Sequence, residues 1–432
     1  MESIAVIGLG YVGLPLALDL ADAGHRVQAV DVSPERIARL AAGDSYIDDV
    51  PAARLRASLE SGRLELSDTT RGWDEGQVAF ICVPTPVTAS GEPDLSAILA
   101  AGSYVCQGLS RRDLVVLQST TYPGTTMGPL RASLEAGGLA AGEDFGLAFA
   151  PERVSPGESR PASSIPRLVG GIDAASAERA AAILRRISPE VMVLSSPDAA
   201  ELAKLFENVF RNVNIALVNE LALICERLGL DVWEVIGGAS TKPFGFMTFY
   251  PGPGVGGHCI PVDPYYLAAR VREVGFHERF VETAGDINAQ MPEHVIRLVG
   301  RALNERGKPL RGARVLIIGV AFKPNVSDDR NTPAAPIVAG LQAAGADVSY
   351  HDPFLPTFCP DGRPGCPACL SSQPLDAAMD ARPDCVVIVT THADLDWDRV
   401  FEADLIVDTR NASAGHATRP GQVLRLGAGW SR

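Results

Sequence analysis

The strongest constraint on the fold is a motif of three spaced glycines near the N-terminus, Gly8, Gly10 and Gly13. Residues 3–8 are β-rich and apolar, and residues 12–23 have helical spacing, so the glycines stand between a predicted strand and a predicted helix. In such a turn Gly8 forms the bend, Gly10 admits a pyrophosphate to the helix N-terminus, and Gly13 permits close packing of helix and strand. The pattern therefore predicts a βαβ unit that binds a dinucleotide.

An acidic residue follows at the position that selects the dinucleotide. Asp31 ends the next predicted strand, residues 26–31, and stands 18 residues after Gly13. A carboxylate there can accept hydrogen bonds from both ribose hydroxyls, which favours NAD over NADP. The alternative is a glycine turn needed only for packing, with Asp31 as an exposed strand end. Because strand, helix and acid all stand where a dinucleotide requires them, we favour the binding site.

The rest of the chain predicts a second α/β domain and a helical segment between the two. Residues 1–197 alternate strands and Ala-rich helices, as in a mostly parallel sheet. Residues 198–308 begin with a helix of about 30 residues, about 45 Å long, and βα alternation resumes in residues 309–432. We expect two Rossmann-like doubly wound α/β domains joined by a helical core with one long central helix. The further strands expected are residues 78–83, 114–118, 146–150, 167–170, 191–194, 314–319, 347–350, 385–390 and 404–407.

Composition limits the partners of the chain. The 432 residues include 38 Lys and Arg against 52 Asp and Glu, and the net charge of −14 argues against nucleic acid as a partner. No stretch approaches the roughly 20 consecutive apolar residues of a membrane span, and the N-terminal segment has no secretory signal. We expect a cytoplasmic protein without membrane contact. Cysteines inside apolar runs, such as Cys82 and Cys225, are expected to be buried thiols of a reducing compartment.

The long helix carries three polar side chains on one face. Lys204, Asn208 and Arg211 follow at i, i+4 and i+7 and project within about 60° of one another. They could form a solvated stripe, but the stripe continues into Ile215 and Val218, which water would not favour. We therefore expect a semi-buried polar wall. The apolar residues of the opposite face are Leu202, Phe206, Val209 and Val213.

The Gly/Pro-rich loop from Tyr250 to Pro264 is the most unusual segment. It leads to Cys259 and, four residues later, Asp263, which indicates a backbone shaped around a ligand with a thiol at its tip. A cysteine thiolate can attack an aldehyde carbon to form a thiohemiacetal, from which a hydride can leave to give a thioester. The alternative is a structural cysteine beside a rigid turn. His258 needs no role beyond that of a hydrogen-bond donor in the loop.

A second cysteine group, Cys359, Cys366 and Cys369, lies in another Pro/Gly-rich loop. Three thiols that include a Cys-X-X-Cys could hold zinc, with His351 as a fourth ligand. Because that fourth ligand is not fixed and the sequence has no second Cys-X-X-Cys, we favour no metal and expect unligated or redox-sensitive surface thiols.

Together these motifs resemble the nucleotide-sugar 6-dehydrogenases, the UDP-glucose/GDP-mannose dehydrogenase family, over nearly the full length. The matching segments are Gly8-Leu-Gly-Tyr-Val-Gly-Leu-Pro15, Val83-Pro-Thr-Pro86, Ser119-Thr-Thr-Tyr-Pro-Gly-Thr-Thr126, Pro151-Glu-Arg153, Lys204 to Glu220, Gly256-Gly-His-Cys259 and Phe322-Lys-Pro-Asn-Val-Ser-Asp-Asp-Arg330. The resemblance implies an NAD-binding domain, a central helical dimerisation domain with the cysteine loop, and a UDP-sugar-binding domain, in the order expected above.

The resemblance also implies chemical roles. Cys259 would be the nucleophile of a second oxidation step. Lys204 and Asn208 would stabilise the developing oxyanion, where a cation and an amide in a dry site contribute most. Glu152, together with Thr121 and a water, would serve proton transfer and thioester hydrolysis.

Further contacts are implied in the same way. Asp263 would support the water network near Cys259. The implied cofactor contacts are Gly8, Gly10, Tyr11, Val12, Gly13, Asp31, Arg36, Pro84, Thr85, Thr120 and Arg330. The implied substrate contacts are Lys204, Asn208, Arg211, Tyr250, Gly256, Lys323 and Arg410.

The implied reaction oxidises the C6 alcohol of a UDP-sugar to the acid in two NAD-dependent steps, without release of free aldehyde. Residues 240–266 resemble the branch that acts on UDP-N-acetylglucosamine, while UDP-glucose and UDP-N-acetylmannosamine stay open because a few pocket contacts decide between them. A non-catalytic nucleotide-sugar-binding protein and a single-oxidation hydroxyacid dehydrogenase are less favoured by the same residues. We expect a homodimer or higher oligomer through the long helix, and a product that feeds surface polysaccharides.

Overall fold

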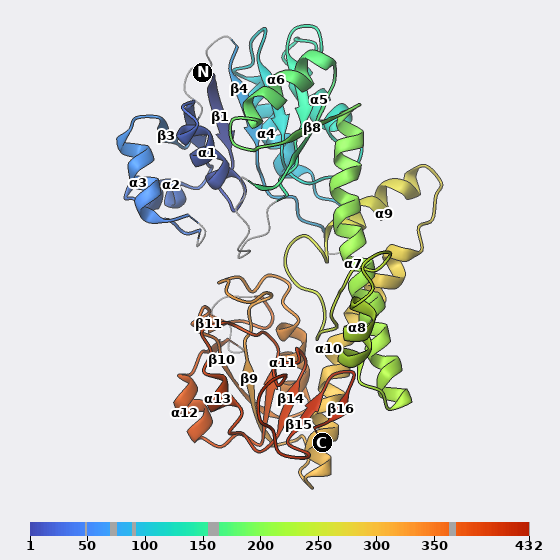
Figure 1. Ribbon diagram of the computed structural model, residues 1–432. Coiled ribbons are helices and arrows are strands. Elements are labelled where there is room, and N and C mark those ends of the chain that lie inside the picture. The colour runs from blue at the N-terminus through green and yellow to red at the C-terminus, as the bar shows by residue number, and fades with distance from the viewer. Residues whose placement is uncertain (48–49, 70–75, 89–91, 154–163, 363–368, 432) are drawn as a thin grey trace. The chain divides into compact units, whose positions relative to one another are not determined.

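The computed structural model describes residues 1–47, 50–69, 76–88, 92–153, 164–362 and 369–431. The chain forms two compact units (Figure 1). The first unit consists of Met1–Asn208 and Val262–His277, and the second of Val209–Pro261 and Glu278–Arg432. The segment expected as a central domain is therefore divided between the two units.

An eight-stranded sheet forms the centre of the first unit. Its strands lie in the order β3-β2-β1-β4-β5-β6-β7-β8, and every neighbouring pair is parallel except β6 and β7. The carboxyl ends of β1, β2, β4, β5 and β6 therefore lie along one edge, which is where ligands bind in doubly wound sheets. The strands are β1 Ser3–Ile7, β2 Arg26–Val30, β3 Leu64–Ser67, β4 Val78–Ile81, β5 Leu114–Leu117, β6 Gly146–Phe149, β7 Arg167–Gly171 and β8 Val191–Leu194.

Helices cover both faces of this sheet. Successive side chains of β4 alternate between two buried clusters: Val78 and Phe80 pack with α1 and α6, whereas Ala79 and Ile81 pack with α4 and α5. Because neither face is left to solvent, the central strands are apolar on both sides. The helices are α1 Gly13–Asp22, α2 Pro34–Ala41, α3 Ala52–Glu60, α4 Ser96–Cys106, the π-helix η1 Thr126–Leu130, α5 Arg131–Glu135 and α6 Ala174–Leu184.

The long helix α7, Pro197–Leu228, has 32 residues and begins in the first unit. There it packs against α9, Asp263–Glu273. Leu205 of α7 and Tyr266 of α9 are both fully buried in the same cluster. This contact brings the first polar residues of α7 close to the N-terminus of α9.

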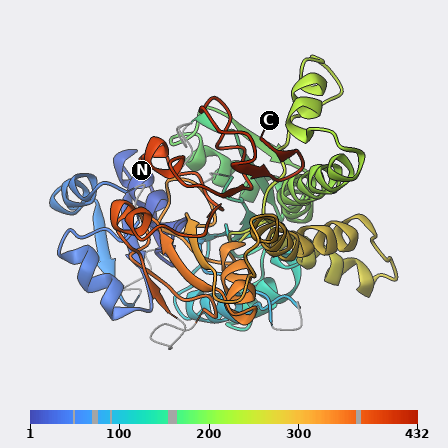
Figure 2. The same cartoon turned by 90° about the horizontal axis from the view of Figure 1, so that it is seen from below.

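A six-stranded sheet forms the centre of the second unit, in the order β10-β9-β13-β14-β15-β16, parallel except for β15 and β16. Helices α10 and α11 pack on one face, and α12 and α13 on the other (Figures 1 and 2). The strands are β9 Arg314–Ile318, β10 Asp347–His351, β13 Cys385–Ile388, β14 Ile406–Asp408, β15 Val423–Arg425 and β16 Gly429–Trp430, with a separate hairpin of β11 Thr357–Phe358 and β12 Leu370–Ser371. The helices are α8 Val232–Ser240, α10 Phe280–Glu305, α11 Ala334–Ala343, α12 Leu375–Asp380 and α13 Trp397–Val400.

The structure confirms the predicted class: two parallel-dominated Rossmann-like sheets and one long helix. The sequence analysis did not predict β3 or the short strands β11, β12, β15 and β16, which have two to four residues each and too few alternations for a pattern. Among the described residues, no helix combines the length and the apolar character needed to cross a membrane.

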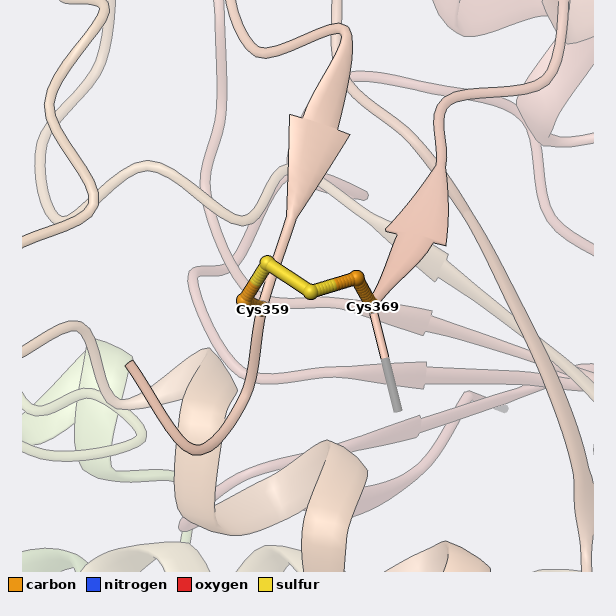
Figure 3. The surroundings of a disulfide bond; sticks show 2 residues. All are labelled: Cys359 and Cys369. Carbon is orange, nitrogen blue, oxygen red and sulfur yellow. A yellow bond between two sulfur atoms is a disulfide. The ribbon is translucent and has the colours of Figure 1, made fainter. Parts of the chain in front are cut away.

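The second cysteine group, for which we expect unligated or redox-sensitive surface thiols, contains a disulfide. Cys359 and Cys369 form a disulfide beside the β11–β12 hairpin (Figure 3). A sulfur in a disulfide is not a thiolate, so neither residue can bind a metal in this state. Cys366 lies outside the described residues, and Nδ1 of His351 lies 2.7 Å from the carbonyl oxygen of Gln373.

Candidate active site

The glycine turn after β1 has the geometry that a dinucleotide requires. Gly8 has a φ of +92°, and a Cβ on Gly13 would lie 1.8 Å from the carbonyl oxygen of Gly8, so helix and turn approach this closely only without a side chain there. In the described part of the chain, nothing beyond its neighbours in sequence lies within 4 Å of a Cβ placed on Gly10. The first turn of α1, which begins after the partly buried Tyr11 and Val12, is open where a pyrophosphate binds.

Asp31 is buried at the end of β2. Its carboxylate accepts hydrogen bonds from the main-chain N–H groups of Leu9 and Ser33, each at 2.9 Å, and lies 3.3 Å from the guanidinium of Arg36. These contacts fix the carboxylate beside the glycine turn. Since a carboxylate has about four acceptor positions, it can also accept from ribose hydroxyls.

Other expected residues follow neighbouring strands at the same edge. Pro84 and Thr85 come after β4, Thr120 and Thr121 after β5, and Glu152 after β6. Because β4, β5 and β6 are adjacent and parallel, these segments emerge side by side. Thr121 is fully buried, and its hydroxyl oxygen lies 2.7 Å from that of Thr125.

Glu152 is held by donors from its neighbours. Its carboxylate accepts from the Arg153 N–H at 2.8 Å, from Nε2 of Gln118 at 3.3 Å and from the guanidinium of Arg167 at 3.0 Å. The sequence analysis did not single out Gln118 or Arg167. The signal for them is their place beside apolar strands: Gln118 follows β5 and Arg167 begins β7, and a polar side chain that is buried there requires a partner.

The polar face of α7 meets the N-terminus of α9. Lys204, Asn208 and Asp263 are all buried, and Nδ2 of Asn208 donates to Oδ2 of Asp263 at 2.5 Å. Burial raises the pKa of Asp263 to about 7, although the charge of Lys204 and the hydrogen bond from Asn208 favour its ionised form. A cation, an amide and a carboxyl group that exchanges a proton near neutral pH thus lie together. The predicted polar wall is confirmed for Lys204 and Asn208, whereas Arg211 is exposed in this chain.

The sequence analysis also missed Glu201, which stands one turn before Lys204. Its buried carboxyl group accepts from Gly124 N–H at 2.7 Å, and from the N–H and hydroxyl of Thr126 at 2.9 and 2.6 Å. Burial raises the pKa of Glu201 to about 7, against the effect of these three hydrogen bonds. The contacts join α7 to the segment that carries Thr121.

In the second unit, the loop that carries Cys259 is fixed at Gly257. The N–H of Gly257 donates to the carbonyl of Arg330 at 2.9 Å, and its carbonyl accepts from Nδ2 of Asn331 at 3.0 Å. Gly257 has a φ of +88°, and a Cβ there would lie 2.9 Å from the ring of Phe322, so the position requires glycine. Cys259 is partly buried and lies outside the one disulfide of the described residues. The hydrogen bonds of Gly257 therefore tie the backbone near Cys259 to the loop that follows β9.

Arg410 follows β14 and approaches the same loop. Its Nε donates to the carbonyl of Val389 at 2.9 Å, and a Cβ on Gly252 would lie 2.5 Å from one of its terminal nitrogens. Burial lowers the pKa of Arg410 to about 10, which leaves it cationic at neutral pH. Gly256 also lies close to a side chain, since a Cβ there would be 2.8 Å from Cβ of Phe322.

The remaining expected contacts of the second unit occupy different environments. Lys323 is partly buried in the loop after β9. Tyr250 is exposed and stacks on Trp233, with ring centroids 5.9 Å apart. The guanidinium of Arg330 lies 2.6 Å from the carboxylate of Asp328, which holds it within its own loop.

Comparisons with known proteins give the family of this chain. The UDP-glucose/GDP-mannose dehydrogenase family matches in three consecutive parts: its NAD binding domain at residues 2–188, its central domain at residues 198–290 and its UDP binding domain at residues 316–414. The chain belongs to this family. It is therefore an NAD-dependent oxidoreductase, as the sequence analysis predicts.

Relatives and a solved structure agree with this assignment. The UDP-N-acetyl-D-glucosamine 6-dehydrogenase of Pseudomonas aeruginosa is 37% identical over 355 residues, which are 82% of this chain and 83% of that protein. The UDP-N-acetyl-D-mannosamine dehydrogenase of Pyrococcus horikoshii is 33% identical over 416 residues, 94% of this chain and 95% of that protein. The structure of a UDP-D-ManNAc dehydrogenase from Pyrococcus horikoshii superimposes with a TM-score of 0.87 and 31% identity, over 99% of this chain and 100% of that chain.

The residues of the first unit fit NAD. The open N-terminal turn of α1 can take the pyrophosphate, and Asp31 can accept from the ribose. Together with the matched NAD binding domain, these observations confirm the predicted cofactor of the enzyme.

Proposed function

We propose that this enzyme oxidises the C6 hydroxyl of UDP-N-acetylglucosamine to the carboxylic acid in two steps through a covalent intermediate on Cys259. The observation that carries the proposal is the buried cluster of Lys204, Asn208 and Asp263. The first two lie on one turn of α7, and Asp263 begins α9, four residues after Cys259 in the chain. A cation and an amide donor in a dry site stabilise a developing oxyanion.

The reaction balances without a further oxidant. One UDP-sugar, two NAD⁺ and one water give one UDP-uronate, two NADH and three protons, and NAD⁺ accepts one hydride in each oxidation. In the second oxidation the Cys259 thiolate adds to the C6 aldehyde, and Lys204 and Asn208 hold the oxygen that becomes negative. Loss of the second hydride leaves a thioester at C6. Water then adds to the thioester carbon, the C–S bond breaks, and the thiolate returns.

Two carboxyl groups are available for the proton transfers. Glu152 is fixed by Arg167 and Gln118 at the carboxyl edge of the sheet, beside the segment of Thr121, and is our candidate base for the hydrolytic water. Asp263 has a pKa of about 7 and can therefore take up and release a proton near neutral pH. We assign Asp263 to the support of the water network in which Cys259 reacts.

The substrate assignment concerns one acetamido group and one epimeric centre. The 27 residues from Ser240 to Tyr266 carry the likeness to enzymes for UDP-N-acetylglucosamine, and a relative named for that substrate is 37% identical. A relative named for UDP-N-acetyl-D-mannosamine is 33% identical, so that sugar is the first competitor to test, with UDP-glucose second. On the sugar side we assign binding to Arg211, Tyr250, Gly256, Lys323 and Arg410.

We further propose that the enzyme is a homodimer through α7. Six large apolar side chains of this helix are exposed, and their spacings of four and seven residues place them on one stripe: Leu202, Phe206, Phe210, Leu217, Ile224 and Leu228. A second copy of the same helix offers a stripe of the same length, which would remove these side chains from water.

Replacement of the nucleophile tests the mechanism. Cys259→Ser should lower the steady-state formation of uronate by more than about 100-fold, because an alkoxide is not available at neutral pH as a thiolate is, while one slow hydride transfer can persist. Cys106→Ser, at a partly buried cysteine on α4, is the matched control and should retain full activity. Full activity of Cys259→Ser would contradict the covalent mechanism and favour a single-oxidation dehydrogenase.

A further inference from the structure

Three asparagines lie buried in the second unit, outside the residues assigned above. Asn212 and Asn219 are two turns apart on α7, and Asn288 stands on α10. Their exposed fractions are 5%, 0% and 6%. Buried amides without partners would be costly, so the hydrogen bonds that they make must be accounted for.

The three amides form one directed chain of hydrogen bonds, which we call the asparagine relay. Nδ2 of Asn288 donates to Oδ1 of Asn212 at 2.8 Å, and Nδ2 of Asn219 donates to Oδ1 of Asn288 at 2.9 Å. Oδ1 of Asn219 accepts from the main-chain N–H of Gly252 at 2.9 Å. The relay therefore ends on the loop that leads to Cys259.

The direction of the relay is fixed at both ends. Gly252 N–H can only donate, and the main-chain carbonyl of Asn212, which lies 3.3 Å from Nδ2 of Asn288, can only accept. A flip of any one amide would place two donors or two acceptors against each other. Asn288 consequently holds Nδ2 of Asn219, while Oδ1 of Asn219 faces the loop.

The same loop packs on the backbone of Asn288. Pro292 stands inside α10 and has no N–H, so the carbonyl of Asn288 lacks the usual helical donor four residues on. A Cβ on Gly254, whose φ is +133°, would lie 3.5 Å from that carbonyl oxygen and 3.4 Å from Cδ of Pro292. Asn288 thus meets the loop at Gly254 through its backbone and at Gly252 through the relay.

We propose that the asparagine relay is a positioning device that sets the Tyr250–Cys259 loop, and that Asn288 is a positioning residue for the nucleophile. This inference rests on the proposed role of Cys259. The loop is held at Gly252 by the relay and at Gly257 by Arg330 and Asn331, and Cys259 follows two residues after the second anchor. Loss of the first anchor removes the hydrogen bond between Gly252 and a side chain of α7, and the hydrogen bonds at Gly257 remain.

The test compares two substitutions of Asn288. Asn288→Leu has the same number of side-chain heavy atoms and a similar branched shape, although it is larger, and it has neither donor nor acceptor, so Asn219 loses its hydrogen-bond partner on α10. Asn288→Asp keeps an acceptor for Asn219, and burial favours its protonated form, which can also donate to Asn212. Asn304→Ala, at an exposed position of the same helix, is the control.

Two readouts are measured on the folded full-length variants. The first is kcat and KM with NAD and the UDP-sugar, and the second is the rate at which iodoacetamide alkylates Cys259 without substrate, followed by peptide mass spectrometry. For Asn288→Leu we expect kcat to fall by about 10-fold or more and KM to change by less than about 3-fold, because a displacement of the order of 1 Å at a reacting group is enough. We expect alkylation to accelerate by about 5-fold as the loop loosens. Asn288→Asp and Asn304→Ala should stay within about 3-fold of the wild type in both readouts.

A merely structural role would lower the thermal midpoint of Asn288→Leu and leave kcat and alkylation unchanged, which would overturn the proposal. An equal loss in Asn288→Asp would also overturn it, because the orientation of Asn219 would then not be the cause. If Asn288→Leu does not fold, Asn288→Ser removes the fixed acceptor at smaller volume and is judged by the same outcomes. If wild-type enzyme makes no uronate, the proposed function fails, and the alkylation rate still tests the relay.

Discussion

Replacement of Asp263 by asparagine should stabilise the protein relative to the wild type by an amount that grows as the pH rises. The same substitution should remove activity. Asp263 is buried, and its pKa rises from an ordinary 3.8 to about 7 on folding. Between these two values the folded chain keeps a proton that the unfolded chain has released. The carboxyl group therefore lowers the free energy of unfolding of the wild type progressively from about pH 4 to about pH 7. Above about pH 7 this loss stays constant.

The magnitude follows from the two pKa values. A difference of about three pH units at about 1.4 kcal/mol each corresponds to about 4 kcal/mol at pH 8, and the same relation gives about 2 kcal/mol at pH 5. The amide that Asp263→Asn introduces can still accept the hydrogen bond from Asn208 but never ionises. Urea unfolding followed by circular dichroism should therefore show a stability gain of Asp263→Asn that doubles from pH 5 to pH 8, with uronate formation reduced by at least about 100-fold. A gain that does not change with pH, or full activity, would refute the reasoning.

Two other changes have expected outcomes. Glu201→Gln places an amide N–H₂ against at least one of three donors from Gly124 and Thr126, so kcat should fall by about 10-fold. Glu220→Gln, on the exposed side of α7, is the control. An unchanged kcat in Glu201→Gln would show that this segment does not depend on Glu201. Replacement of Cys359 and Cys369 by serine opens a loop of sequence separation 10 and should lower the free energy of unfolding by about 2–3 kcal/mol without loss of turnover. The thermal midpoint of the wild type in excess dithiothreitol should fall to that of the variant, and no difference between oxidised and reduced wild type would contradict the disulfide.

The sequence predicted the parts of this protein that local chemistry determines. The strand–glycine–helix order around Gly8 and Gly13 has one good structural solution, so both the first βαβ unit and the cofactor follow from it. The sequence predicted the burial of Lys204 and Asn208 because the polar stripe of the long helix on which they lie continues into apolar residues. The long helix was visible because no glycine or proline interrupts it before Gly229.

The parts that the sequence did not predict depend on contacts distant in the chain. Glu201 and Gly124 are 77 residues apart, and Asn219 and Asn288 are 69 apart, so no local pattern connects them. The pairing of Cys359 with Cys369 depends on the β11–β12 hairpin, whose strands are too short to be recognised. Arg211 shares a face with Asn208 by helical spacing, but its exposure depends on what the tertiary structure places opposite it.

The most direct test of the account is the amount of NADH formed per sugar consumed by the wild-type enzyme. UDP-N-acetylglucosamine, UDP-N-acetylmannosamine and UDP-glucose would be offered separately in limiting amount with excess NAD, and NADH read at its absorbance maximum. The account predicts two NADH per UDP-N-acetylglucosamine, with the uronate as product and little turnover of the other two sugars. Two NADH from another UDP-sugar would keep the mechanism and overturn the substrate assignment, and one NADH per sugar from any of them would contradict the double oxidation through Cys259.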